Sequence, residues 1–102
     1  CEKMFEYIKE NYRDPNISTK QLAEIFQLSQ SYLSMNFAKI YGESPSYFIN
    51  RYRIEESVRL LNDPSLTVKK IAEIVGYGHE RTFSRNFKKE KNIYPHEYRK
   101  ML

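Results

Sequence analysis

Apolar residues recur every three or four positions along most of the chain, and short segments rich in Pro, Gly and Ser interrupt them. This spacing is typical of amphipathic helices. The first apolar segment predicts a packing helix over residues 2–12, which ends at Asp14-Pro15. A short second helix is expected behind the cap residues Ser18 and Thr19. Its predicted apolar face consists of Leu22, Ala23, Ile25 and Phe26.

The third helix is expected to begin after the turn Gln27-Leu28-Ser29, with Ser29 as its cap, and to run to about Tyr41. Gly42 follows it, where a left-handed residue commonly ends a helix. The predicted inner stripe of this helix is Leu33, Phe37 and Ile40.

Ser44 and Pro45 predict the start of a fourth helix, and Asp63-Pro64 predicts its end. This helix is expected to cover residues 45–62 and to measure about 27 Å at 1.5 Å per residue. It is therefore long enough to separate two modules.

Three further helices complete the pattern. Thr67 is the expected cap of a fifth helix over residues 68–75, and Gly76-Tyr77-Gly78 forms the next turn. A sixth helix runs from residue 79 or 80 to 91, with Asn92 in the left-handed position that ends it. A short closing helix follows Pro95. The pattern predicts an all-α fold of seven helices without strands.

Two stretches of the chain repeat each other about fifty residues apart. Leu22-Ala23-Glu24-Ile25 recurs as Ile71-Ala72-Glu73-Ile74, and Leu33-Ser34-Met35-Asn36-Phe37 recurs as Phe83-Ser84-Arg85-Asn86-Phe87. Such a repeat indicates two copies of one supersecondary motif. We therefore expect one domain over residues 1–102, with a first helix-turn-helix unit over 1–43, a linker helix over 44–63 and a second unit over 64–102.

Each copy pairs a short capped helix with a longer helix whose outer face is polar, which is the helix-turn-helix pattern. The longer helix of this motif fits the major groove of B-DNA. Successive major grooves on one face of the duplex lie about 34 Å apart. Two copies joined by a spacer helix therefore predict a protein that binds double-stranded DNA at two adjacent grooves.

The net charge of +4 is concentrated in the second copy. Residues 67–92 hold seven Lys and Arg against three Glu, whereas residues 18–43 hold two Lys against two Glu. A clustered basic surface is typical of proteins that bind a polyanion. We expect the second copy to supply most of the electrostatic attraction and the first copy to refine the choice of sequence.

The chain shows little capacity for other chemistry. Cys1 is its single cysteine, and His79 and His96 lack partners at metal-ligand spacing, so no metal, disulfide or cofactor is expected. The sequence contains no paired carboxylates, no nucleophile with a base and no phosphate-cradling loop, which argues against an enzyme. The absence of a long apolar run and of a signal peptide predicts a cytoplasmic, nucleoid-associated location without membrane contact.

The chain resembles the DNA-binding domain of the AraC/XylS family of bacterial transcription regulators, and the resemblance covers nearly all of it. The residues that carry it are Leu22-Ala23, Ser29, Tyr32-Leu33-Ser34, Phe37, Gly42, Tyr52, Arg53-Ile54, Leu60-Leu61, Ile71-Ala72, Val75-Gly76-Tyr77, Phe83-Ser84-Arg85, Phe87-Lys88-Lys89, Pro95 and Tyr98-Arg99. The resemblance implies seven helices, two helix-turn-helix units, a linking helix and a role as a transcription regulator, usually an activator. It also implies contact with RNA polymerase.

The chain departs from the family pattern at three positions. His79 stands where Asp is usual, Asn92 where Gly is usual, and Ser57 where Ala is common. These changes affect the expected DNA specificity more than the fold. His79, near the start of the sixth helix, is expected either to contact DNA or to cap that helix.

The first residue is Cys rather than Met, which suggests a longer protein, and dimerisation is then expected through a preceding region.

The outward residues of the two longer helices are the candidates for base contact. In the third helix they are Gln30, Ser31, Ser34 and Met35. Gln can bond adenine in a bidentate manner, Ser can bond several bases, and Met can contact a thymine methyl group. In the sixth helix they are His79, Glu80, Arg81, Ser84 and Arg85. Arg81 and Arg85 are suited to guanine, and Glu80 either accepts from cytosine or pairs with Arg85 or Ser84 within the helix.

Five lysines are the candidates for phosphate contact, because they lie further along these helices or near the starts of the supporting helices: Lys20, Lys39, Lys69, Lys88 and Lys89. Each is alternatively a solvated surface charge. Two other functions stay open at this point, a helical protein-interaction module and a non-specific architectural DNA binder.

Overall fold

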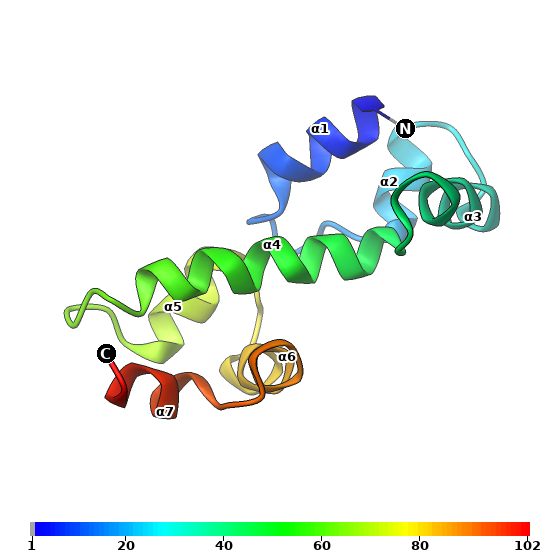
Figure 1. The fold of residues 1–102 in the computed structure, drawn as a ribbon. Coiled ribbons are helices and arrows are strands. Elements are labelled where there is room, and N and C mark those ends of the chain that lie inside the picture. Colours follow the sequence, from blue (N-terminus) through cyan, green and yellow to red (C-terminus); the bar gives the residue numbers. More distant parts are fainter. Residues whose placement is uncertain (1) are drawn as a thin grey trace.

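The computed structural model describes residues 2–102, which form seven α-helices and no strand (Figure 1). The helices are α1 (Glu2–Asn11), α2 (Thr19–Ile25), α3 (Gln30–Tyr41), α4 (Pro45–Leu60), α5 (Val68–Val75), α6 (Glu80–Lys91) and α7 (Pro95–Lys100). The predicted all-α fold with two helix-turn-helix units and a linking helix is confirmed. The linking helix α4 is shorter than expected, because Leu61 closes its last turn and residues 61 and 62 belong to the following turn.

Polar side chains cap four of the helices, as the sequence predicts. Ser18, Ser29, Ser44 and Thr67 each accept a hydrogen bond from the backbone N–H three residues further on, over distances of 3.0–3.3 Å. These bonds satisfy N–H groups that have no partner within the helix.

Left-handed residues end α3 and α6, again as predicted. Gly42 has φ +79° and Asn92 has φ +64°, and the N–H of each bonds a carbonyl four residues back. Asn tolerates this conformation better than most residues with a side chain.

The core is divided into two clusters of buried side chains. The helices that surround them lie toward opposite ends of α4 (Figure 1). Helices α1, α2 and α3 surround the first cluster, to which α4 contributes Ile49. Helices α5, α6 and α7 surround the second, to which α4 contributes Ile54 and its C-cap residue, Leu61. We call α1–α3 the first unit and α5–α7 the second unit. The molecule is elongated along α4 and measures 43 × 21 × 20 Å.

Two residues that the sequence placed on inner faces are exposed. Ile40 is 61% exposed and Ile25 is 44% exposed. In the last turn of α3, Tyr41 packs inward instead, with its ring stacked 5.0 Å from Phe5 and tilted 4.6 Å from Phe37. The predicted inner stripe was therefore wrong at position 40, because the aromatic neighbour takes that place in the core.

The structural repeat begins earlier than the repeated sequence motifs. Asp14 and Asp63 each follow a helix, and each carboxylate accepts the backbone N–H two residues further on at 2.9 Å. The Ser65 hydroxyl also donates to Asp63, and these bonds lower the pKa of the Asp63 carboxyl. A helix and an Asp-Pro turn therefore precede the pair α2 and α3, and again the pair α5 and α6. Helix α4 follows the first unit and is the helix that precedes the second.

Arg53 lies at the middle of α4, between the two core clusters, and is only 7% exposed. Its Nε donates to the carbonyl of Tyr12 at 2.8 Å, and its Nη2 donates to the carbonyl of Asp14 at 2.9 Å. Its guanidinium also lies over the ring of Tyr77, 5.1 Å from the ring centre. Burial lowers the pKa of Arg53 and raises the pKa of Tyr77 to about 12. Near neutral pH the Tyr77 hydroxyl is therefore protonated, and Arg53 carries the charge that a guanidinium group keeps in proteins.

Candidate nucleic-acid interface

Helix α3 presents its candidate residues on the side away from the first core. Leu33 and Phe37 are buried on the inner side, whereas Ser31 and Met35 lie one turn apart on the outer side. Met35 is 66% exposed. Gln30 and Ser31 are also exposed, and Ser34 is half-buried at the edge of this face. None of these side chains bonds another group within residues 2–102, so their polar atoms are available to a partner.

Helix α6 presents a face in the same register. Arg81 and Arg85 stand fifty residues after Ser31 and Met35 and are both exposed, opposite the buried Phe83. In the described part of the chain, neither arginine pairs with a carboxylate. Two free guanidinium groups therefore lie one helical turn apart on the outer face of α6.

The other candidates of α6 lie around its first turns. Glu80 is exposed and Ser84 is half-buried. The alternative in which Glu80 pairs with Arg85 or Ser84 is not found among residues 2–102. His79 is exposed and occupies the N-cap position, but its side chain makes no cap hydrogen bond. His79 is therefore the cap residue of α6 by position, without a hydrogen bond from its imidazole to the backbone.

The five lysines proposed for phosphate contact are all exposed. Lys20 and Lys69 lie in the first turns of α2 and α5, and Lys39 and Lys89 lie in equivalent places on α3 and α6. Lys88 is held differently. Its Nζ donates to the carbonyl of Asn92 at 3.1 Å and lies 5.2 Å from the ring centre of Tyr94.

Ion pairs reduce the free charge of the second unit. Lys91 pairs with Glu55 of α4 at 2.6 Å, and Lys70 lies 3.9 Å from Glu73. Within residues 2–102, the basic residues of segment 67–92 without a carboxylate partner are Lys69, Arg81, Arg85, Lys88 and Lys89. The free positive charge is thus concentrated on or next to α6.

Helices α3 and α6, which carry the candidate base contacts, have similar directions. In Figure 1, α3 and α6 are both seen nearly along their axes, whereas α4 extends across the view. The two helices lie toward different parts of the long axis of the molecule.

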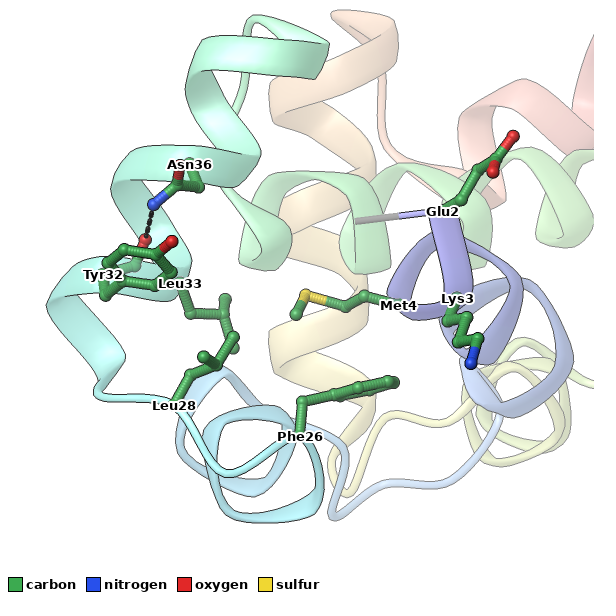
Figure 2. A pocket seen from close by; sticks show the side chains of 8 residues that line it. All are labelled: Glu2, Lys3, Met4, Phe26, Leu28, Tyr32, Leu33 and Asn36. Carbon is green, nitrogen blue, oxygen red and sulfur yellow. Dashed lines mark hydrogen bonds between the residues drawn. The ribbon is translucent and has the colours of Figure 1, made fainter.

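An open groove of about 450 Å³ borders this surface on the first unit (Figure 2). It lies between the start of α1, the turn between α2 and α3, and the start of α3. Phe26, Leu28 and Leu33 form much of its lining, and Asn36 donates to the carbonyl of Tyr32 at its edge at 2.8 Å. None of the predicted contact residues lines the groove, so it is separate from the candidate interface.

Sequence reasoning overlooked the residues that hold the two units together. Along α4 and its cap, one row of buried positions recurs every four residues and consists of Ile49, Arg53, Ser57 and Leu61. An arginine and a serine on an otherwise apolar stripe are an available signal for a buried polar contact. Ser57 illustrates it, because its buried hydroxyl donates to the carbonyl of Ile54 at 2.6 Å.

Residues 22–101 match a family model described as a helix-turn-helix domain. A putative AraC-like transcription regulator from Streptomyces lividans is 36% identical over 91 residues, which represent 87% of this chain and 30% of that protein. The uncharacterized HTH-type transcriptional regulator YisR from Bacillus subtilis is 33% identical over 96 residues, covering 94% of this chain and 33% of that protein. The chain thus spans about a third of the length of these curated relatives.

One solved structure resembles the chain in both fold and sequence. It is the C-terminal domain of the two-component response regulator yesN from Fusobacterium nucleatum, with a TM-score of 0.91 and 34% identity. The match covers 96% of this chain and 95% of that chain. No helix in residues 2–102 is both long enough and apolar enough to cross a membrane.

Proposed function

Because the chain belongs to the AraC-type family of helix-turn-helix transcription regulators, we propose that it binds double-stranded DNA in a sequence-specific manner through α3 and α6. One observation carries the proposal. Two helices in equivalent places present exposed side chains that have no partner within residues 2–102, and those of α6 include two free arginines. The function is recognition rather than chemical conversion.

The dimensions of the molecule support contact with two successive major grooves. These grooves lie about 34 Å apart on one face of B-DNA. The molecule is 43 Å long, and its two longer helices have similar directions toward different parts of that length (Figure 1). Each helix therefore inserts its outer face into one groove.

Base readout depends on the outer side chains of the two helices. Arg81 and Arg85 donate to guanine O6 and N7, and Glu80 accepts from cytosine N4. His79 contacts the DNA beside them. On α3, Gln30 bonds adenine, while Met35 contacts a thymine methyl group. Ser31, Ser34 and Ser84 complete the base contacts.

Phosphate contacts supply the sequence-independent part of the affinity. Lys20, Lys39, Lys69 and Lys89 are exposed, and within residues 2–102 none of them pairs with a carboxylate. Lys88 reaches phosphate after releasing the carbonyl of Asn92. These contacts release condensed counterions, so the affinity falls as salt rises.

The chain acts within a longer transcription regulator, since its curated relatives are about three times as long. The remaining part dimerises and receives the regulatory signal. Contact with RNA polymerase follows from a role as an activator at the bacterial nucleoid.

Binding measured against salt tests the proposal. Duplexes selected from a random library by the chain serve as the probe, and their affinity is measured between 50 and 200 mM salt. A sequence-specific DNA binder loses affinity steeply over this range, by about a thousandfold when six or more phosphates are contacted. A flat response would favour a protein-interaction module. Equal affinity for selected and shuffled duplexes would favour a non-specific architectural binder.

A further inference from the structure

An arginine contacts an Asp-Pro turn in both halves of the molecule, so this contact alone does not join the two units. Arg99 of α7 contacts the turn after α4 in the same way, with Nε and Nη2 donating to the carbonyls of Leu61 and Asp63 at 3.3 Å. Arg53 contacts the carbonyls of Tyr12 and Asp14 after α1. What distinguishes Arg53 is its additional contact with the second unit. The contact between the units is therefore at Gly76 and Tyr77.

Gly76 brings the backbone of the second unit against the backbone of the first. It ends α5 with φ +109°. A Cβ atom at this position would lie 2.8 Å from the carbonyl oxygen of Tyr12, 2.9 Å from that of Arg13 and 2.9 Å from Nε of Arg53. Distances below 3.0 Å are not tolerated, so only glycine allows the two turns to approach this closely.

Polar contacts on both sides of Gly76 fix the same arrangement. The hydroxyl of Tyr77 donates to Oδ1 of Asn50 on α4 at 2.9 Å. Arg13, in the turn of the first unit, pairs with Glu56 on α4, and its Nε donates to Oε1 at 2.9 Å. Both turns are thus tied to α4 next to Arg53.

We propose that the contact of Gly76 and Tyr77 with Arg53 and the turn after α1 locks the two units at one separation and orientation. The consequence for DNA rests on the proposed function: the chain binds a bipartite site with one fixed spacing. Inserting one base pair moves the second half-site by 3.4 Å and rotates it by roughly 34°. A locked protein does not follow this movement, whereas a hinged one does.

Two glycines of the chain provide a matched pair of variants. Gly42 also has a positive φ, +79°, but a Cβ there meets nothing within 4 Å. Gly76→Ala and Gly42→Ala therefore both introduce backbone strain, while only Gly76→Ala pushes the two units apart. Tyr77→Leu is a third variant that keeps an apolar side chain in the core but removes the contact with Arg53 and the bond to Asn50.

The first measurement requires no DNA. Spin labels are placed at Lys39 and Lys89, both exposed, in a chain carrying Cys1→Ser, and their distance distribution is measured by double electron-electron resonance. A single narrow distribution is expected for the parent chain and for Gly42→Ala. A broadened or shifted distribution is expected for Gly76→Ala, and for Tyr77→Leu should Gly76→Ala fail to fold. Equal distributions in the parent, Gly76→Ala and Tyr77→Leu chains would overturn the lock.

The second measurement uses the selected duplexes and copies with one inserted base pair between the two halves. The parent chain and Gly42→Ala are expected to bind the inserted copy about tenfold more weakly or worse, and Gly76→Ala to show less than about a threefold difference. A parent chain that binds both duplexes equally would overturn the proposal. Failure of the parent chain to select any sequence would instead contradict the proposed function. The spin-label distances would still show whether the two units keep one fixed separation.

Discussion

The first and second units share one backbone plan but present different chemistry. Ser31 and Met35 on α3 occupy the same helical places as Arg81 and Arg85 on α6, and both pairs are exposed. One pair offers a small hydroxyl and an apolar side chain, and the other offers two free guanidinium groups. The comparison teaches that the repeated positions specify the fold, whereas the outer positions differ between the units, and we predict that this difference sets the role of each unit in DNA binding.

The interiors of the two units differ as well. The first core is surrounded by a group of aromatic rings, among which Phe5 lies 5.0 Å from Tyr41 and 5.8 Å from Phe48. The second core includes the buried rings of Tyr77, Phe83 and Phe87, whereas the partly buried side chains around it are mainly aliphatic. The same helical arrangement is therefore supported by two different sets of packing contacts.

Truncation of a central phenylalanine in either core is the largest change that we expect. Phe37→Ala and Phe83→Ala should each lower the free energy of unfolding by about 3–5 kcal/mol, because both rings are fully buried. Urea unfolding followed by circular dichroism measures the loss, with the exposed Met35→Ala as the control, expected within about 0.5 kcal/mol. A much smaller loss in only one unit would show that the two cores are not equivalent in stability.

Removing the outer side chains tests the different roles of the units in DNA binding. Arg85→Ala should weaken binding to the selected duplex by about 10- to 100-fold, because a bidentate contact to guanine is lost. Met35→Ala, at the same place on α3, should weaken it by less than about threefold, since only an apolar contact is lost. Filter binding on selected and random duplexes measures both. Equal losses of Arg85→Ala on the two duplexes would assign Arg85 to phosphate.

Removal of the N-cap side chain is expected to change the stability of the two units by different, smaller amounts. Ser29 accepts the N–H of Tyr32 at 3.1 Å, so Ser29→Ala should cost about 1 kcal/mol of stability. His79 makes no side-chain cap bond, and His79→Ala should change the stability by less than about 0.5 kcal/mol. Thermal unfolding of the two variants provides the comparison. A large loss for His79→Ala would reveal a cap contact.

The smallest effect is expected from single lysines, through the dependence of affinity on salt. Lys89→Gln and Lys39→Gln should each reduce the slope of log affinity against log salt by about 0.9, which corresponds to one phosphate contact. Lys91→Gln is the matched control, because Lys91 already pairs with Glu55 at 2.6 Å. A slope that does not change in the Lys89 variant would exclude this residue from the phosphate contacts.

Local signals in the sequence were sufficient for most of the fold. Ser29, Gly42, Thr67 and Asn92 mark helix ends through bonds to nearby backbone, and their roles are confirmed. The exposure of Ile40 was not predictable from periodicity, because it depends on how Tyr41 packs against α1.

The candidate contact residues follow from helical register alone, and their roles in DNA binding stay predictions. The contact between the units was missed for a different reason. It brings Gly76 and Tyr77 against Arg53 and against the backbone carbonyls of Tyr12 and Arg13, which are far apart in the sequence. Backbone carbonyls carry no sequence signal, so Arg53 on the buried stripe of α4 indicates a buried polar contact but does not identify its partners.

Helix α4 also determines how this domain can be recombined with its relatives. Because Ile49 belongs to one core and Ile54 to the other, neither unit is complete without part of this helix. A chimera that exchanges one unit must therefore be joined inside α4, next to Arg53, rather than in a loop. The exchanged turn must also preserve the glycine at position 76. A unit with a different DNA-contacting helix can thus be introduced only if its core fits the part of α4 that it packs against.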